Sequence, residues 1–144
     1  MAQDKGGIRE ATLRVLRAVP PLALITAWLL PGFVHLLLGK RFHAALFLIC
    51  VVVFFVVGDI ASDFYGVSSH YHFYAFVAQL CAGVPVLVHL AVCGQPSSDI
   101  FVGRISPYYD AGVIYMMVAG LLNVAAVADA LERLYRRTQD GDGD

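Results

Sequence analysis

Long runs without a charged side chain constrain this chain more than any other feature of its sequence. Residues 46–58, LFLICVVVFFVVG, contain no polar side chain at all. Four mainly apolar segments occur, each of about 20 residues, the length that a helix needs to cross about 30 Å of hydrocarbon. They lie at residues 22–39, 42–61, 73–93 and 111–130. The pattern predicts four transmembrane helices.

The composition supports the same class. Charged residues make up 15% of the 144 residues and hydrophobic residues 59%, whereas a soluble domain carries about 25% charge. A chain of this size cannot bury so much apolar surface under a polar shell, so we expect an integral membrane protein with the lipid bilayer as its surroundings. The net charge of −1 argues against nucleic acid as a partner, because phosphate binding needs a concentrated basic face.

The two ends of the chain are polar. In residues 1–20 apolar side chains fall on one helical face and arginines on the other, and Pro20 and Pro21 then end the helix. The pattern predicts a short amphipathic helix in the membrane interface, or a basic arm that only sets orientation. We expect lipid headgroups at Arg9, Arg14, Arg17, Lys40 and Arg41. Residues 131–144 are basic and then acidic, typical of a flexible tail.

The expected fold is therefore all-α: a four-helix membrane bundle over residues 21–130 with an interfacial N-terminal helix. Pro31 and Gly32 interrupt the first segment, so a re-entrant first segment is the alternative. In both topologies one side of the membrane carries more Lys and Arg residues than the other, and by the same margin. The positive-inside rule therefore does not choose between the two topologies. Because both ends carry arginines, we expect four crossings with both termini in the cytoplasm.

Two histidines lie inside apolar segments. His35 and His89 each stand four residues before the end of a segment, and with four crossings these two segments run parallel. The histidines are then expected at one depth. Together they suggest a bis-histidine haem b or metal site, or, as the commoner alternative, two histidines bonded to neighbouring helices. We expect no cofactor, with haem b as the alternative.

Other polar and small residues of the segments favour helix packing. Gln79 and Asn123 are expected at a second common depth, where side-chain amides bond helices together. The fourth segment is rich in small residues, which let helices approach closely. We therefore expect helix contacts at Gly112, Ala119, Gly120, Asn123 and Gln79.

The polar loop at residues 59–72 offers a possible metal site. His70 and His72 lie on one side of an extended chain, and Asp63 is near in sequence. Two histidines and a carboxylate can bind a metal, although short His-x-His pieces are common by chance. Elsewhere the sequence has no nucleophile elbow, zincin motif, phosphate-binding loop or dinucleotide fingerprint, so we expect no enzyme.

A family resemblance follows from two motifs. The stretch PGFVHLLLGKR, residues 31–41, resembles the PG-x-x-H-x-x-x-G-[KR] opening of small bacterial multi-pass membrane proteins related to TM2-type domains. Residues 112–129 look like the end of an uncharacterised family that shares this opening. The resemblance implies a multi-pass protein of the bacterial inner membrane and implies nothing about its activity.

The function expected from the sequence is non-enzymatic. Short loops and a small-residue helix favour an accessory or scaffolding subunit that binds other membrane subunits in a larger inner-membrane complex. The alternative is a haem b or quinone-linked electron-transfer subunit that uses His35 and His89.

Overall fold

The computed structural model describes residues 3–96 and 106–139, and within these ranges the secondary structure is helical without strands. The predicted all-α class is confirmed. The helices are α1 (Gln3–Ala18), α2 (Pro20–Leu29), α3 (Phe33–Leu37), α4 (Arg41–Ala61), α5 (Phe73–Leu80), α6 (Val84–Val92) and α7 (Tyr109–Gln139).

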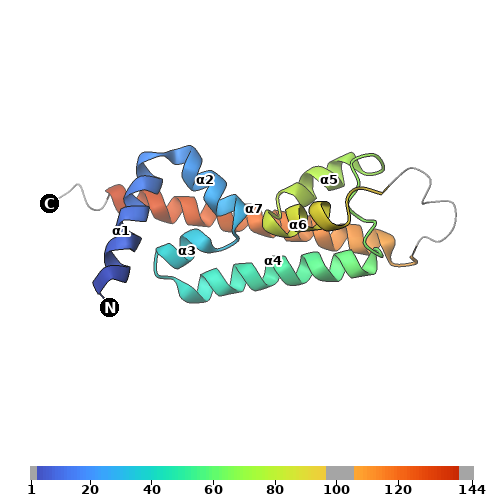
Figure 1. The fold of residues 1–144 in the computed structure, drawn as a ribbon, viewed down its shortest axis with the longest axis horizontal. Helices are drawn as coiled ribbons and strands as arrows, with labels where there is room; N and C mark the ends of the chain where they lie inside the picture. The colour runs from blue at the N-terminus through green and yellow to red at the C-terminus, as the bar shows by residue number, and fades with distance from the viewer. Residues whose placement is uncertain (1–2, 97–105, 140–144) are drawn as a thin grey trace.

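Two long helices, α4 and α7, form the frame of the molecule and lie side by side along its long axis (Figure 1). They run antiparallel and meet closely where Gly58 faces Gly112, because a Cβ on either glycine would collide with the backbone of the other helix. Both helices are long and apolar enough to cross a membrane. They correspond to the predicted segments at residues 42–61 and 111–130, although α7 continues to Gln139.

The first predicted segment, residues 22–39, is not one straight helix. It breaks after α2 at Leu30–Gly32, and α3 leads the chain back toward the end from which α2 came (Figure 1). Gly32 has φ +79°, and a Cβ there would collide with the backbone of Ala44. A left-handed residue that must also lack a side chain explains the Gly, and Pro31 before it removes a helical donor. We call α2 and α3 the first hairpin.

The third predicted segment, residues 73–93, is broken in the same way. Helices α5 and α6 are bent by 119° at residues 81–83, and α6 returns to the end where α5 began (Figure 1). Gly83 has φ +74°, and a Cβ on it would collide with the carbonyl oxygen of Trp28 in α2. We call α5 and α6 the second hairpin. Two of the four expected segments are thus broken, so the described residues contain two uninterrupted helices of spanning length, and up to four spans if each bent pair of helices counts as one.

The two halves of the chain repeat one plan in opposite directions. Each half has a short helix, a break at a left-handed glycine, a second short helix, and then a long helix, α4 or α7. The hairpins enter from opposite ends of the frame and meet near its middle (Figure 1). This arrangement matches the inverted-topology repeats and broken helices known from membrane proteins.

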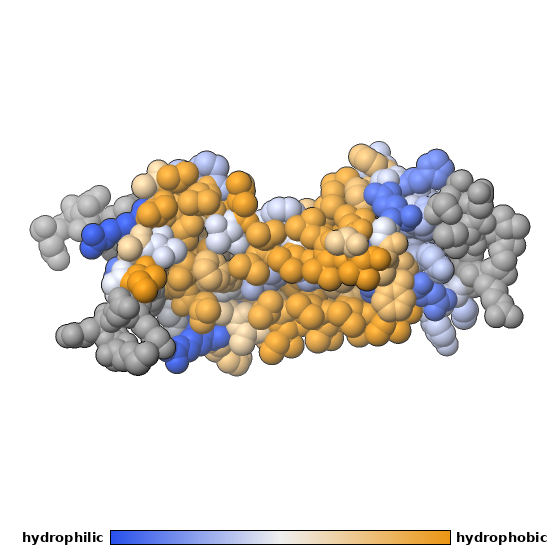
Figure 2. Space-filling model, viewed as in Figure 1, coloured by the Kyte–Doolittle hydropathy of each residue, from blue (hydrophilic) through white to orange (hydrophobic). Residues whose placement is uncertain are grey.

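The surface has an apolar middle and polar ends. Apolar residues cover most of the visible face between its two ends, and hydrophilic residues gather at the two ends of the long axis (Figure 2). At one end Leu13 and Leu16 of α1 are buried in a core that also contains Ala130 and Leu134 of α7. The helical spacing of the sequence puts Ile8 and Val15 on the apolar face of this helix, but both are exposed, because the two leucines face the bundle instead. Arg14, Lys40 and Arg41 lie at this end, and the side chains of Arg9 and Arg17 fall outside the described part.

We predict that Gly83→Ala destabilises the fold more than Gly94→Ala. Both glycines have a left-handed φ, but a Cβ at Gly94 meets nothing within 4 Å, whereas one at Gly83 meets the backbone of α2. Left-handed strain alone costs about 1–2 kcal/mol, so we expect that loss for Gly94→Ala and roughly twice it or more for Gly83→Ala. Chemical unfolding in detergent measures both. Equal losses would contradict the close contact between the two hairpins.

Candidate functional site

The tips of the two hairpins are joined by side chains from α2 and α7. Asn123 donates from Nδ2 to the carbonyl oxygens of Trp28 and Cys81, both at 2.8 Å, and Trp28 donates from Nε1 to the carbonyl oxygen of Leu80 at 3.1 Å. Carbonyls freed by a helix break are costly in an apolar medium unless they find such donors. Asn123 therefore supplies hydrogen-bond donors to backbone carbonyl groups at the breaks of both hairpins.

The first buried His–Asp pair links the second hairpin to α4. Nδ1 of His89, in α6, lies 2.9 and 3.0 Å from the two carboxylate oxygens of Asp59, in α4. A carboxylate can only accept, so Nδ1 carries the proton and donates. His89 is 4% exposed, and its other ring nitrogen, Nε2, has no hydrogen-bond partner among the described residues.

The second pair links the first hairpin to α7. Nε2 of His35, in α3, lies 2.7 Å from a carboxylate oxygen of Asp129, which also accepts from Nε of Arg133 at 2.7 Å. His35 is completely buried, against the rings of His43 and Phe47 in α4. Each hairpin thus supplies a histidine from its returning helix, and the long helix of the other half supplies the aspartate.

The two histidines do not share a depth, so that prediction was wrong. His35 packs on Phe47, and His89 bonds Asp59, twelve residues further along α4, which corresponds to about 18 Å of helix. The reason is the reversal of the chain in both hairpins, which places each histidine near the end where its hairpin enters. No geometry in the structure brings His35 and His89 to one haem.

The residues expected to bind a metal in the loop are not brought together. Among the described residues no group of three His, Cys, Asp or Glu side chains is placed to hold a metal ion. The ring of His70 packs on Tyr71, and that of His72 on Tyr109. Asp63 is exposed on a backbone with φ +53°.

The structure places the expected packing residues at helix contacts. Gly112 faces Gly58, and a Cβ on Gly120 would collide with the carbonyl oxygen of Ala78 in α5. Ala119 is buried in the core between α4, α6 and α7. Gln79 donates to the carbonyl oxygen of Gly66 at 3.1 Å, not to Asn123, so these two amides serve different partners.

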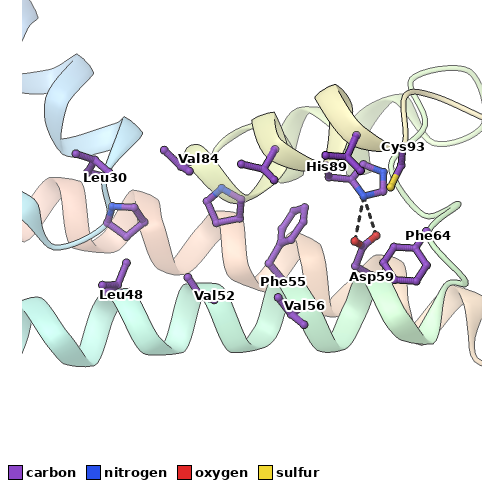
Figure 3. A pocket seen from close by; sticks show the side chains of 14 residues that line it. Leu30, Leu48, Val52, Phe55, Val56, Asp59, Phe64, Val84, His89 and Cys93 are labelled. Carbon is purple, nitrogen blue, oxygen red and sulfur yellow. Dashed lines mark hydrogen bonds and ion pairs between the residues drawn. The ribbon is translucent and has the colours of Figure 1, made fainter.

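An apolar groove runs along α4 beside the Asp59–His89 pair. Its volume is about 410 Å³, and Figure 3 shows the pair at one end and Leu30 and Leu48 at the other. The walls between are mostly aliphatic, from α4 and α6. The groove therefore has polar side chains at one end and apolar walls along the rest of its length.

Sequence reasoning missed the roles of Asp59 and Asp129. Asp59 directly follows the apolar run of residues 46–58 and falls in the expected polar loop, and Asp129 is the second-last residue of the fourth expected segment. One signal was present: an acidic residue inside a span needs a partner, and histidines in other spans were the candidates. The choice of partner depends on chain direction, which hydropathy does not report.

We predict that removing the histidine destabilises the fold more in the Asp59–His89 pair than in the His35–Asp129 pair. His89→Leu leaves Asp59, 13% exposed, without a described partner, whereas His35→Leu leaves Asp129, 31% exposed, with Arg133. Breaking a buried pair costs about 3–5 kcal/mol, so we expect that loss for His89→Leu and a smaller one for His35→Leu. Unfolding in detergent measures both. The double variant Asp59→Leu/His89→Leu should regain stability, and a further loss in it would contradict this account.

Comparison with known proteins gives one result. A family model described as a family of unknown function (DUF6677) matches residues 22–139, which include both hairpins and both long helices. No curated protein matches the chain, and no solved structure does.

Proposed function

The chain belongs to this family of unknown function, and we propose that it is a non-enzymatic subunit of the bacterial inner membrane. In this proposal α4 and α7 cross the bilayer, the two hairpins re-enter it from opposite sides, and both termini are cytoplasmic. The observation that carries the topology is the distribution of basic residues over the fold.

Basic residues concentrate at one end of the frame. That end holds α1, the start of α4 and the end of α7 (Figure 1), and with them nine of the ten Lys and Arg residues of the chain: Lys5, Arg9, Arg14, Arg17, Lys40, Arg41, Arg133, Arg136 and Arg137. The tenth, Arg104, lies outside the described residues. Cytoplasmic segments carry such an excess. With two re-entrant hairpins these nine residues all fall on one side of the membrane, and the rule favours that side as cytoplasmic.

Cysteine labelling in intact cells tests this topology. In a variant with Cys50, Cys81 and Cys93 changed to Ser, we introduce Lys40→Cys or Ser69→Cys. We expect a membrane-impermeant maleimide to label position 69 and not position 40, because the two lie at opposite ends of α4. Four straight crossings predict the reverse, so labelling at position 40 alone would overturn the proposal.

The accessory role is supported by the outer face of α7. The exposed residues Ile114, Leu121, Ala125 and Ala128 recur at helical spacing, and small residues among larger apolar ones let another helix approach closely. The hairpin tips are joined by hydrogen bonds, and the grooves of the described part are lined by apolar surface. Both features argue against a path for a solute through one chain. We infer that the chain associates with another membrane protein through this face of α7.

Blue-native electrophoresis of gently solubilised membranes tests the association. We expect the wild-type chain in a species larger than its monomer and Leu121→Trp to release it. Ile49→Trp is the matched control, because Ile49 on α4 is also 59% exposed but lies on a different helix. Migration of the wild-type chain as a bare monomer would overturn the accessory role, and equal effects of both substitutions would exclude this face of α7.

A further inference from the structure

The Asp59–His89 pair has the geometry that prepares a general base. Nδ1 of His89 donates to Oδ2 of Asp59 at 3.0 Å, and in the neutral imidazole this tautomer leaves the lone pair on Nε2. That nitrogen is buried and has no partner among the described residues. A carboxylate that orients an imidazole in this way is the arrangement used to activate hydroxyl and thiol nucleophiles.

A thiol stands one helical turn from this imidazole. The backbone N–H of Cys93 donates to the carbonyl oxygen of His89 at 2.8 Å, and residues four apart on a helix have Cβ atoms about 5–6 Å apart. Figure 3 draws the sulfur of Cys93 beside the imidazole ring, at the same end of the groove. The two side chains make no hydrogen bond in the described structure, so transfer of the thiol proton to Nε2 requires rotation of Cys93 about its Cα–Cβ bond.

The other two cysteines lack this setting. Neither Cys50 nor Cys81 has a histidine three or four residues away, and the thiol of Cys81 donates to the carbonyl oxygen of Val77 at 3.5 Å. Cys93 is also the most exposed of the three. The chain therefore carries one cysteine with an oriented base and two internal controls.

The groove beside Cys93 suits an alkyl chain. From Leu48 to Asp59 its residues follow α4 for eleven positions, about 16 Å, and aliphatic side chains from α4 and α6 line it. Its polar end holds Asp59, His89 and Cys93 (Figure 3). A molecule that fits has a long apolar tail and a reactive polar group at one end.

We propose that Cys93 is an S-acylation site, which accepts a long-chain acyl group whose chain lies in the groove. The proton of the Cys93 thiol passes to Nε2 of His89, and the sulfur forms a bond to the acyl carbon. The bond from that carbon to the donor's oxygen or sulfur breaks, and the donor leaves with the proton from Nε2. No redox step is involved. His89 is the base, and Asp59 positions it.

The donor is an acyl compound from one of two sources, the oxygen ester of a membrane phospholipid or a soluble acyl thioester. Cys93 lies at the end of α6, near the end of the long helix α4 (Figure 1), a depth that either donor can reach. The chain is the acceptor, so this modification is independent of the accessory role proposed above and of its orientation.

The test uses the full chain reconstituted in phosphatidylcholine vesicles. One arm contains phosphatidylcholine with an alkyne-tagged acyl chain, and the other receives an alkyne-tagged palmitoyl thioester. We expect label that neutral hydroxylamine removes and that peptide mapping places on Cys93. Cys93→Ser should lose the hydroxylamine-labile label, while Cys50→Ser and Cys81→Ser keep it. The arm that labels identifies the donor, and absence of labile label on Cys93 in both arms overturns the proposal.

A second measurement isolates the role of the ion pair. The rate at which iodoacetamide alkylates Cys93 should fall at least tenfold in Asp59→Asn and in His89→Gln, because both remove the oriented base. Asp129→Asn is the matched control, since it alters the other pair and should leave the rate unchanged. An equal rate in wild type and in a folded Asp59→Asn variant, checked by its elution as a monodisperse peak, would overturn the role of the pair.

Discussion

Backbone carbonyl groups released by two broken helices set the central constraint of this structure. In the hydrocarbon region of a membrane each such carbonyl group needs a hydrogen-bond donor. Three donors are supplied where the hairpin tips meet: both hydrogens of the Asn123 amide and the indole N–H of Trp28. These three bonds join the tips of the two hairpins, where the left-handed Gly32 and Gly83 reverse the chain.

The two His–Asp pairs connect the two halves of the chain near the ends of the frame. Each joins a hairpin to the long helix of the opposite half, so the halves are linked at both ends as well as in the middle. The pairs are not equivalent. Asp129 has a second partner in Arg133, whereas Asp59 depends on His89 alone within the described residues and borders the apolar groove. Each histidine keeps one ring nitrogen without a hydrogen-bond partner among the described residues, Nδ1 of His35 and Nε2 of His89, and that of His89 lies at the end of the groove that Cys93 also lines.

Part of the site was accessible from the sequence. His35, His89, Gln79 and Asn123 could be named as the polar residues of apolar segments, because polar groups in such segments are costly and must find partners. Their partners could not be named. His35 meets a residue 94 positions away and His89 one 30 positions away, and both pairings follow from chain reversals that a straight-helix interpretation excludes.

The sequence alone determined the helical class, the apolar character and the two long helices, because hydropathy and length are summed along the chain. Pro31 and Gly32 also marked one break. Only the tertiary structure decided that two of the four apolar segments turn back, that the basic residues gather at one end, and that each histidine faces an aspartate. The physical reason is that hydropathy measures how much of a segment avoids water and carries no information on its direction. Direction is set by left-handed glycines and by the donors that satisfy the broken backbone.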